Sequence, residues 1–380
     1  MSITDRRGQP AQQIRMSAQE IASLGERIRS LHDEICRFEP AVDRMACALY
    51  DPEMDLLKTF VNSTHKGTPL TAYQYPLSQS PSLLRMAQTG EPRVLDDIPG
   101  ELDSHSEHTR WLLAQGFRSS YTMPLFVNGE LEGFLFFDST RPALFGPAVT
   151  AQLAVYGRLV ALMISHEATA VRSLVGSVRI AREFAQLRDV ETGVHLERMS
   201  RYCRVIARSL EASHGLNDEF AEQLFLFSPL HDIGKIGVPD SILRKQGGFT
   251  PEERMQMMLH VDKGCDIVER LVHDFGLDSL SGVRILRNLV ASHHEYLDGS
   301  GYPQGLKGEQ IPIEARITTV ADIFDALSSQ RVYKQRWSVE DTVTRLDLMV
   351  EGGKLDRACV QGLKSNAEHV LEIMQRFAEE

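Results

Sequence analysis

Apolar and polar positions follow two different rhythms along this chain. From Ala18 to Arg37 the apolar residues return every three or four positions, which is the spacing of one face of an α-helix. These apolar positions are Ile21, Leu24, Ile28, Leu31 and Ile35. From Met45 onward, short segments mix apolar, β-branched and aromatic residues over the length of a strand. The pattern therefore predicts a helix followed by a sheet.

Four segments carry the strand signal, and turn residues separate them. The segments are MACALYD, LLKTFVN, SSYTMPLFVNG and LEGFLFFDS. Asn128-Gly129 lies between the last two and is typical of a tight hairpin turn. Helical stretches are predicted between the strands, at Ser82–Gln88 and His108–Ala114. The first part of the chain is thus predicted to be an α+β domain with an antiparallel sheet.

The same region resembles the GAF domain, a small sensory module. The resemblance is carried by TGEPRVLDDI, by LLAQGFRSSYTMPLFVNGELEGFLFFDS and by the helix after Phe145. It covers residues 18–166, and residues 1–17 are expected to form a flexible tail. The resemblance implies a fold more than a ligand. GAF domains bind cyclic nucleotides, tetrapyrroles or small metabolites, or bind nothing and mediate dimerisation, and these alternatives stay open.

A long helix is predicted over residues 147–187, where no proline follows the first position and turn residues do not cluster. Two heptad-like seams lie on it, and such seams favour packing against a second helix. One seam is Leu153, Tyr156, Val160 and Met163, and the other is Val171, Leu174, Val178 and Ala181. We expect a homodimer through the GAF-like domain and this connecting helix. The alternative is that both seams pack onto their own domains.

The remainder of the chain, residues 188–380, changes to helical periodicity with few strand signals. The helical segments are VHLERMSRYCRVIARSLEA, DEFAEQLFLFSPLHDIGK, PEERMQMMLHVDKGCDIVERLV, SGVRILRNLVASHH and IEARITTVADIFDALSS. This part is predicted to be an all-α bundle.

Composition narrows the class of protein. A length of 380 residues favours two domains, and a net charge of -11 gives no general footprint for a nucleic-acid polymer. The five cysteines are scattered singly and odd in number, which argues against a disulfide framework. The polar start and the short apolar run from Leu153 to Ile164, interrupted by Arg158, predict a cytoplasmic protein without membrane insertion.

Histidines and acidic residues recur in the helical half and offer a set of metal ligands without any thiolate. Imidazole and carboxylate ligands suit iron, manganese or zinc held for hydrolysis. The candidate ligands are Glu191, His195, His231, Asp232, His260, His293, His294 and Asp322. Ligands from different helices converge in the core of a bundle, so we predict a polynuclear site. Neighbouring helical residues point in different directions, and Asp232 is therefore predicted to bridge two metals.

The motifs around these residues resemble the HD-GYP family of metal-dependent phosphodiesterases that degrade cyclic di-GMP. The matching segments are RDVETGVHLERMSRY, LHDIGKIGVPDSILRKQGGFTPEER, HHEYLDGSGYPQGLKGEQIPIEARI and ADIFDALSSQRVYK, with His260 between the second and third. The resemblance implies an HD-type helical bundle and places ligand roles on the eight residues above. It further implies two or three divalent metals, with Glu191 favouring a third. Iron is the family's most characteristic metal and manganese its usual substitute.

The implied reaction is hydrolysis of cyclic di-GMP to linear pGpG, with GMP as a further product. A water bridging two metals can attack phosphorus, so no side-chain nucleophile is required. Lys235, on the same face as Asp232, is predicted to bind a phosphate oxygen, and an ordinary exposed lysine is the alternative. Lys235 and Asp232 are both candidate catalytic residues. By resemblance, Arg331 and Lys334 form a second phosphate clamp. Two alternative functions remain: a cyclic-dinucleotide receptor with little turnover, or a phosphodiesterase for cyclic GMP-AMP.

The sequence DGSGYP, residues 298–303, is predicted to form a rigid loop, because glycine admits conformations closed to other residues and proline fixes φ. Tyr302 is expected to pack against this loop or to help a signalling protein dock there. Asp325 lies one helical turn after Asp322 and is predicted either to support the metal ligands or to be a plain surface aspartate.

Overall fold

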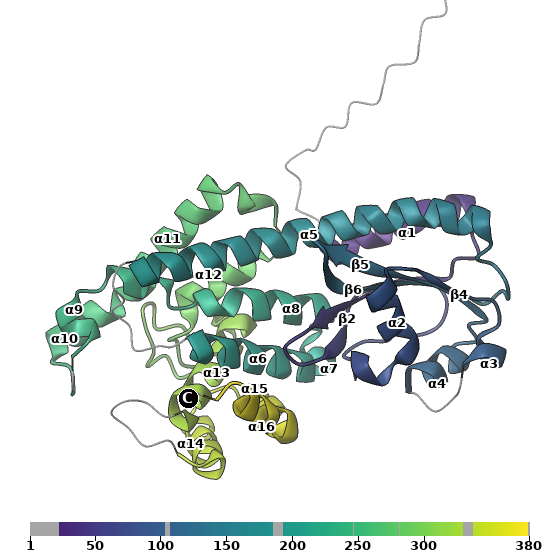
Figure 1. Cartoon of the computed structure of the whole chain (residues 1–380). Coiled ribbons are helices and arrows are strands. Elements are labelled where there is room, and N and C mark those ends of the chain that lie inside the picture. Colours follow the sequence, from purple (N-terminus) through teal and green to yellow (C-terminus); the bar gives the residue numbers. More distant parts are fainter. Residues whose placement is uncertain are drawn as a thin grey trace, which may run out of the picture.

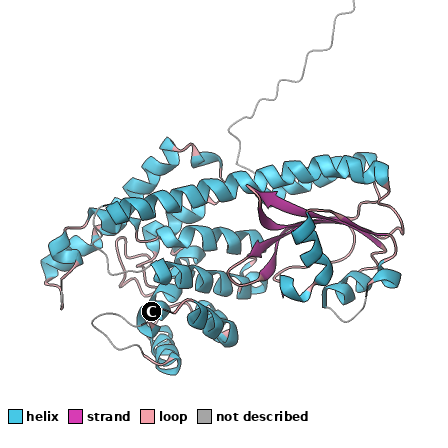
Figure 2. Ribbon diagram, viewed as in Figure 1, coloured by secondary structure: helices cyan, strands magenta, loops and turns pink. Residues whose placement is uncertain are grey.

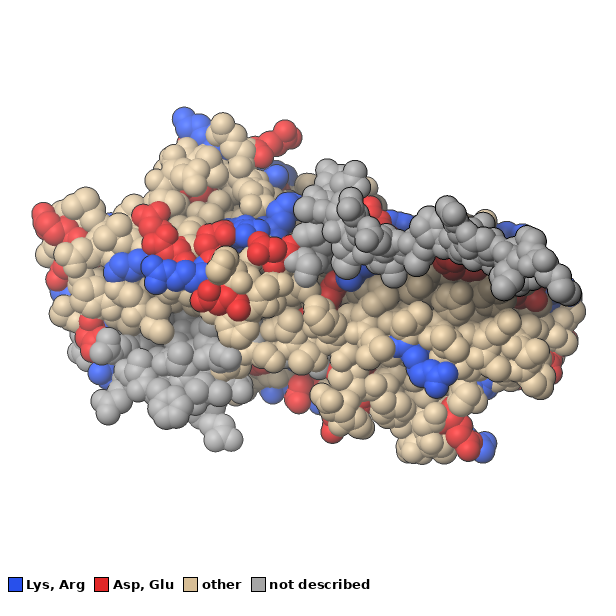
Figure 3. Space-filling view, turned by 90° about the horizontal axis from the view of Figure 1, so that it is seen from above, with Lys and Arg blue, Asp and Glu red and all other residues tan. Residues whose placement is uncertain are grey.

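A computed structural model describes residues 23–102, 107–184, 193–245, 247–280, 282–329 and 337–378. The predicted tail at residues 1–17 lies outside the described residues. Figure 1 shows two lobes, one built around a sheet and one built of helices, with the long helix α5 (Pro147–Phe184) running along both. Seen from above, acidic and basic side chains are intermixed on the visible face of the helical lobe (Figure 3).

The first lobe contains a six-stranded antiparallel sheet in the order β3-β2-β1-β6-β5-β4. Its strands are magenta in Figure 2. The strands are β1 Arg44–Asp51, β2 Leu56–Thr64, β3 Gln74–Pro76, β4 Arg93–Leu95, β5 Ser119–Val127 and β6 Glu130–Ser139. The predicted hairpin turn joins β5 to β6, with Asn128 at φ 51° and Gly129 at φ 89°. The predicted α+β class with an antiparallel sheet is confirmed.

Helices cover both faces of this sheet. The amphipathic helix α1 (Leu24–Phe38) begins after Ser23, whose side chain accepts from the backbone N–H of Glu26 in a capping box. Together with the first half of α5 it packs on one face, while α2 covers the other. The remaining elements of this lobe are η1 Leu77–Gln79, α2 Pro81–Thr89, α3 Ile98–Glu101 and α4 Glu107–Ala114.

The predicted connecting helix is present as α5, but its first seam has a different role from an interface between protomers. Leu153 and Val160 are fully buried in the core of the sheet domain, and Tyr156 and Met163 pack against that core. The expectation of helix pairing through this seam is therefore wrong, since the stripe already covers the sheet. From the second seam, Val171 is buried in the core of the helical lobe, and the side chains of Leu174, Val178 and Ala181 lie outside the described residues.

By length and composition alone, the segment Pro147–Val171 of α5 could cross a membrane, with a mean hydropathy of 1.5 and 22% of its most apolar window buried. The apolar run is thus longer than the stretch from Leu153 to Ile164 considered in the sequence. Packing in the core of the sheet domain explains the apolar positions that face the sheet, such as Leu153 and Val160. The absence of membrane insertion stays a prediction.

The second lobe is helical, as predicted. Its helices are α6 Gly193–Ser209, α7 Glu211–His214, α8 Asp218–Phe227, α9 Asp240–Leu243, α10 Pro251–Met258, α11 His260–Asp274, α12 Val283–Ser292, α13 Ile313–Ser328, α14 Val339–Glu351, α15 Arg357–Ser365 and α16 Ala367–Arg376. Short 3₁₀ turns are η2 Ser228–Leu230, η3 Ile233–Gly237, η4 Leu277–Ser279 and η5 Gly308–Gln310. One core joins α6, α8, α11, α12 and α13, with further residues from α14, α15 and α16.

The two lobes meet through buried charges and apolar side chains. Asp51, at the end of β1, contacts Lys58 of β2 at 2.5 Å and Arg204 of α6 at 2.8 Å. Glu219 of α8 accepts the first backbone N–H groups of α1, and Met54 of the β1–β2 turn belongs to the helical core. The hairpin formed by β1 and β2 is therefore part of both lobes.

Candidate metal centre

The local fold at His231-Asp232 brings two elements into contact at a glycine. After α8 ends at Phe227, the chain forms the short 3₁₀ turns η2 and η3, and His231 and Asp232 lie between these turns. A Cβ atom on Gly234 would lie 1.8 Å from the carbonyl oxygen of His260. Only glycine permits this approach, which sets η3 against the first turn of α11. His260 is thereby held beside Asp232.

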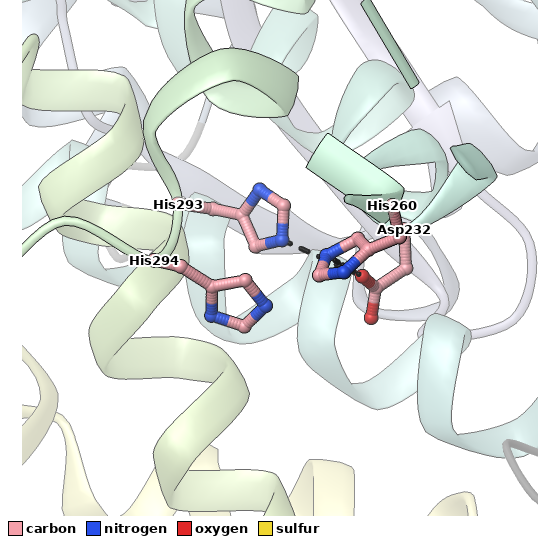
Figure 4. A group of neighbouring side chains, drawn as sticks. All are labelled: Asp232, His260, His293 and His294. Carbon is pink, nitrogen blue, oxygen red and sulfur yellow. Dashed lines mark ion pairs between the residues drawn. The ribbon is translucent and has the colours of Figure 1, made fainter. Parts of the chain in front are cut away.

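One group of side chains gathers around the carboxylate of Asp232. Asp232, His260, His293 and His294 place ligand atoms within 4.8 Å of one another. The Nε2 atoms of His260 and His293 lie 3.1 and 3.4 Å from Asp232 Oδ1. Figure 4 shows the two imidazoles pointing at the carboxylate from different elements, with His294 beside them. Three imidazoles and a carboxylate oxygen form a set that can hold one divalent metal.

A second group lies on the other side of the same carboxylate. It comprises His195 of α6, His231 and Asp322 of α13, again with ligand atoms within 4.8 Å of one another. His231 Nε2 is 3.1 Å from Asp232 Oδ2, and His195 Nε2 is 3.7 Å from Asp322 Oδ1. The two oxygens of Asp232 thus face two different ligand groups. This arrangement is the one that a bridging carboxylate requires.

The histidines are anchored so that Nε2 points inward. The Nδ1 atom of His231 lies 2.9 Å from the Ser228 carbonyl, and that of His260 lies 2.7 Å from the Met257 carbonyl. His293 Nδ1 likewise lies 3.0 Å from the carbonyl of Leu289. Carbonyl oxygens only accept, so each Nδ1 carries the proton and each Nε2 presents a lone pair. Metal-binding histidines are typically held in this way, and the residues therefore fit a divalent metal.

His195 is anchored by a carboxylate instead of a carbonyl. Its Nδ1 lies 2.7 Å from Asp325 Oδ2, and Arg198 Nε donates to Asp325 Oδ1 at 2.6 Å. Burial alone would raise the pKa of Asp325, but the hydrogen bonds from Arg198 and His195 outweigh burial, and the pKa lies below its usual value. Asp325 is only 1% exposed, so of the two readings of this residue the supporting role fits the structure. Sequence reasoning missed Arg198, although its place on the apolar side of α6 was a signal.

The charge state of the centre suits metal binding. Burial lowers the pKa of His293, and burial together with neighbouring histidines lowers that of His294, so both rings are neutral. Burial opposes ionisation of Asp232, yet Lys235 and His231 hold its pKa well below the usual range. Neutral imidazoles around a carboxylate are the protonation states that a metal needs.

The DGSGYP loop borders the centre and is tied to it. Glu295 accepts the backbone N–H groups of Gln304, Gly305 and Leu306 at 2.7 to 3.1 Å. Tyr302 stacks on the His294 ring with centroids 4.7 Å apart. The loop thus supports a ligand from behind, in keeping with its interpretation as a scaffold. Sequence reasoning assigned no role to Glu295, although it stands in the HHEYLDGSGYP segment, because its partners are backbone N–H groups.

The predicted substrate contacts are described only in part. Lys235 Nζ lies 2.7 Å from Asp232 Oδ2, and its side chain is 15% exposed. It therefore stands at the rim of the centre with access to solvent. Glu191, the predicted ligand for a third metal, and Arg331 and Lys334, the predicted second clamp, lie outside the described residues.

Comparison with known families agrees with this architecture. Residues 186–359 match the family model of the HD domain, and residues 33–164 match that of the GAF domain. The chain therefore carries a GAF domain followed by an HD domain. HD domains bind divalent metals, and the two groups of histidine and aspartate described above can hold them.

Three relatives match about half of the chain each. A probable cyclic di-GMP phosphodiesterase of Vibrio cholerae is 37% identical over 205 residues, which are 52% of this chain and 45% of that protein. A 3'3'-cGAMP-specific phosphodiesterase 2 of the same organism is 39% identical over 44% of this chain and 30% of its own length. The cyclic di-GMP phosphodiesterase response regulator RpfG of Xanthomonas campestris is 37% identical over 53% of this chain and 50% of its own length. Each match spans half or less of the relative.

Proposed function

We propose that this chain hydrolyses cyclic di-GMP to linear pGpG at a divalent metal centre in its HD domain. The observation that carries the proposal is the carboxylate of Asp232, whose Oδ1 faces His260 and His293 while Oδ2 faces His231. A carboxylate whose two oxygens face different groups of ligands would suit a pair of divalent metals, which could supply the chemistry for displacing a phosphate ester. Two of the three relatives described above are named as cyclic di-GMP phosphodiesterases.

The ligands of this centre are His195, His231, Asp232, His260, His293, His294 and Asp322, with Glu191 added for a third metal. Iron is the proposed metal and manganese the alternative, since imidazole and carboxylate ligands suit both. When bound, the metals supply an activated water and neutralise charge on the scissile phosphate.

The protein side chains bind and orient the substrate. Lys235 at the rim donates from Nζ to an oxygen of the scissile phosphate, and it exchanges part of its ion pair with Asp232 for this contact. Arg331 and Lys334 hold the second phosphodiester. Asp325 fixes the ring of His195, so that its Nε2 keeps its direction when substrate enters. No side-chain nucleophile takes part.

The test is turnover by protein loaded with iron or manganese without oxygen. Separation of products after incubation with cyclic di-GMP should give pGpG, and the time course shows whether GMP follows. Asp232→Asn should lose metal and activity together while keeping its helical content. Exposed Glu351→Gln, far along α14, serves as a matched carboxylate control with full activity. Absence of turnover with both metals refutes the proposal.

Two alternative functions have distinct outcomes in the same assay. One relative is specific for 3'3'-cGAMP, so that dinucleotide is the competing substrate. Faster hydrolysis of 3'3'-cGAMP than of cyclic di-GMP identifies this activity. Tight binding of cyclic di-GMP without product identifies a receptor instead.

We further propose that the GAF domain regulates the centre through β2. A cavity of about 210 Å³ in this domain is lined by Leu57 and Thr59 of β2, among others. Between these two residues, Lys58 faces the domain interface, and the carbonyl of Thr59 accepts from Arg208 of α6 at 2.9 Å. A ligand in the cavity would therefore touch the strand that contacts the HD domain. A small molecule that shifts the unfolding temperature and the phosphodiesterase rate together would identify such a regulator.

The chain is proposed to act as a cytoplasmic homodimer. All five cysteines are free thiols, as expected in a reducing compartment. On α5, the side chains of Val155, Leu159 and Leu162 are 50%, 43% and 67% exposed, and they lie beside the seam that covers the sheet. Leu162→Glu should convert the dimer to a monomer in light scattering.

A signalling protein is the proposed partner of the DGSGYP loop.

A further inference from the structure

A second cluster of metal-ligating side chains lies in the GAF domain. His32 and Cys36 are four residues apart on α1, which places both on one face of the helix. His65 follows β2 and reaches the same face. The three side chains each offer a ligand atom within 4.8 Å of the others. The centre in the HD domain contains no cysteine, so this cluster has a different chemistry.

The spacing of the cluster suits a tetrahedral cation. Cys36 Sγ lies 3.6 Å from His65 Nδ1. Bond lengths of about 2.3 Å to sulfur and about 2.05 Å to nitrogen, at a tetrahedral angle, separate the two ligand atoms by about 3.6 Å. The pair therefore already stands at the distance that zinc would impose. The His32 and His65 rings stack with centroids 4.2 Å apart and planes 24° from parallel, so His32 lies close by and its ring must turn to direct a lone pair at the same cation.

Neighbouring groups hold the ligands in place. His65 Nε2 lies 3.3 Å from Asp33 Oδ1, which favours the proton on Nε2 and leaves the lone pair of Nδ1 directed at Cys36. This pairing of a carboxylate with a histidine is common behind metal ligands. The carbonyl of Val42 accepts from His32 Nε2 at 2.9 Å and lies 3.5 Å from Cys36 Sγ, and Ser63 Oγ lies 2.8 Å from His32 Nδ1. A cation bound by His32 would replace the hydrogen bond to Val42, with the ring proton moving to Nδ1, which then donates to Ser63 Oγ. One small space thus contains all three ligands.

Acidic neighbours and solvent access suit a cation at this cluster. Burial lowers the pKa of His32, so its ring is neutral. Burial and the nearby carboxylates of Asp33 and Asp43 raise the pKa of the Cys36 thiol. The same carboxylates would favour a cation in place of that proton. Cys36 is half-buried and His65 is 42% exposed, which gives the cation a way in from solvent.

We propose that Cys36, His65 and His32 bind a transition-metal cation of the zinc class, with Asp33 orienting His65 and a water in the fourth position. The thiolate excludes magnesium and calcium, which prefer oxygen ligands. The cation would join the end of α1 to the end of β2. The beginning of α1 is held by Glu219 of the HD domain, so the site lies on an element that contacts both domains.

Cobalt(II) is the probe, because thiolate ligation gives it a charge-transfer absorption that imidazole and carboxylate ligands do not produce. Titration of the metal-free full-length protein should give this band, saturating at one cobalt per chain. Cys36→Ser should abolish the band, and His65→Gln should weaken cobalt binding at least 10-fold. Cys265→Ser, at a half-buried cysteine of the HD domain, is the matched control and should keep the band.

The readout does not depend on phosphodiesterase activity. Asp232→Asn should lose cobalt from the HD centre and keep the thiolate band, which separates failure of this site from failure of the proposed function. Circular dichroism checks the fold of each variant. If a variant fails to fold, a test on the wild type takes its place: zinc should protect Cys36 from a thiol reagent. A wild type without the band, or an unchanged band in Cys36→Ser, overturns the proposal.

Discussion

Replacement of Asp51 by asparagine tests how the two domains are joined. Asp51 ends β1 and is 9% exposed at the domain interface. Its carboxylate contacts Lys58 at 2.5 Å and Arg204 at 2.8 Å, and Arg201 lies 3.8 Å away. Burial alone would raise the pKa of Asp51, but these cations, Lys58 foremost, outweigh burial and hold the pKa below its usual range. The group is therefore a buried anion that offsets several cations.

The expected loss is about 3–5 kcal/mol in the free energy of unfolding, the usual effect of removing one partner from a buried ion pair. Two charge-assisted hydrogen bonds at about 1.5–3 kcal/mol each give a similar figure. Removal of the cationic partner, Lys58, should lower the free energy of unfolding by less. Burial and Arg204 lower the pKa of Lys58 to about 7, so its charge is poorly tolerated. Lys58→Met leaves Asp51 with its arginines and should cost less than Asp51→Asn.

Urea unfolding of the full chain, followed by circular dichroism at pH 7.5, measures these differences. Glu53→Gln, an exposed carboxylate in the same β1–β2 turn, is the matched control and should change stability by less than about 0.5 kcal/mol. The reasoning fails if Asp51→Asn unfolds at the same urea concentration as Glu53→Gln. It also fails if Lys58→Met is the more damaging change.

Three further predictions concern the metal centre and the sheet domain. Asp325→Asn removes the negative charge and one of the two oxygens that hold His195 and Arg198, and should weaken one metal about 10–100-fold; full metal content after dialysis would contradict this. Gly234→Ala places a methyl group 1.8 Å from the His260 carbonyl, so we expect a loss of at least about 3 kcal/mol and of metal, measured by thermal unfolding and elemental analysis. Burial lowers the pKa of His108 to about 4 from 6.5 in the unfolded chain, so the unfolded state takes up the proton first. The free energy of unfolding should fall by up to about 3 kcal/mol as the pH drops from 6.5 towards 4. Measured by urea unfolding, it should depend less steeply on pH in His108→Gln. The same pH dependence in the variant and the wild type would contradict the prediction.

Local patterns predicted the elements of the fold, because each strand and turn signal lies within a few residues. The turn at Asn128-Gly129 is one example. The role of the α5 seam could not be obtained in this way. Leu153 and Leu162 both belong to apolar stripes of one helix, and spacing alone does not tell which stripe faces the sheet.

The candidate ligands could be chosen from residue type and motif, and the described ones lie together in two groups. The residues behind them could not: Arg198 acts through the packing of α6 against α13, and Glu295 binds the backbone of the loop that follows it, which residue type alone does not indicate. The cluster in the GAF domain was missed for a similar reason. Cys36 and His65 are 29 residues apart, and only the fold of α1 against β2 brings them together.

The shared core has a consequence for modularity. The HD match begins at residue 186, yet Met54 from the GAF hairpin and Val171 from α5 are buried among the helices of that domain. A fragment cut at the family boundary would lose both side chains and open a cavity, with a penalty of about 2–5 kcal/mol for a side chain such as Met54. In this chain the GAF domain therefore supplies part of the HD domain's interior, and exchanging it for another domain would require the replacement to supply an equivalent hairpin.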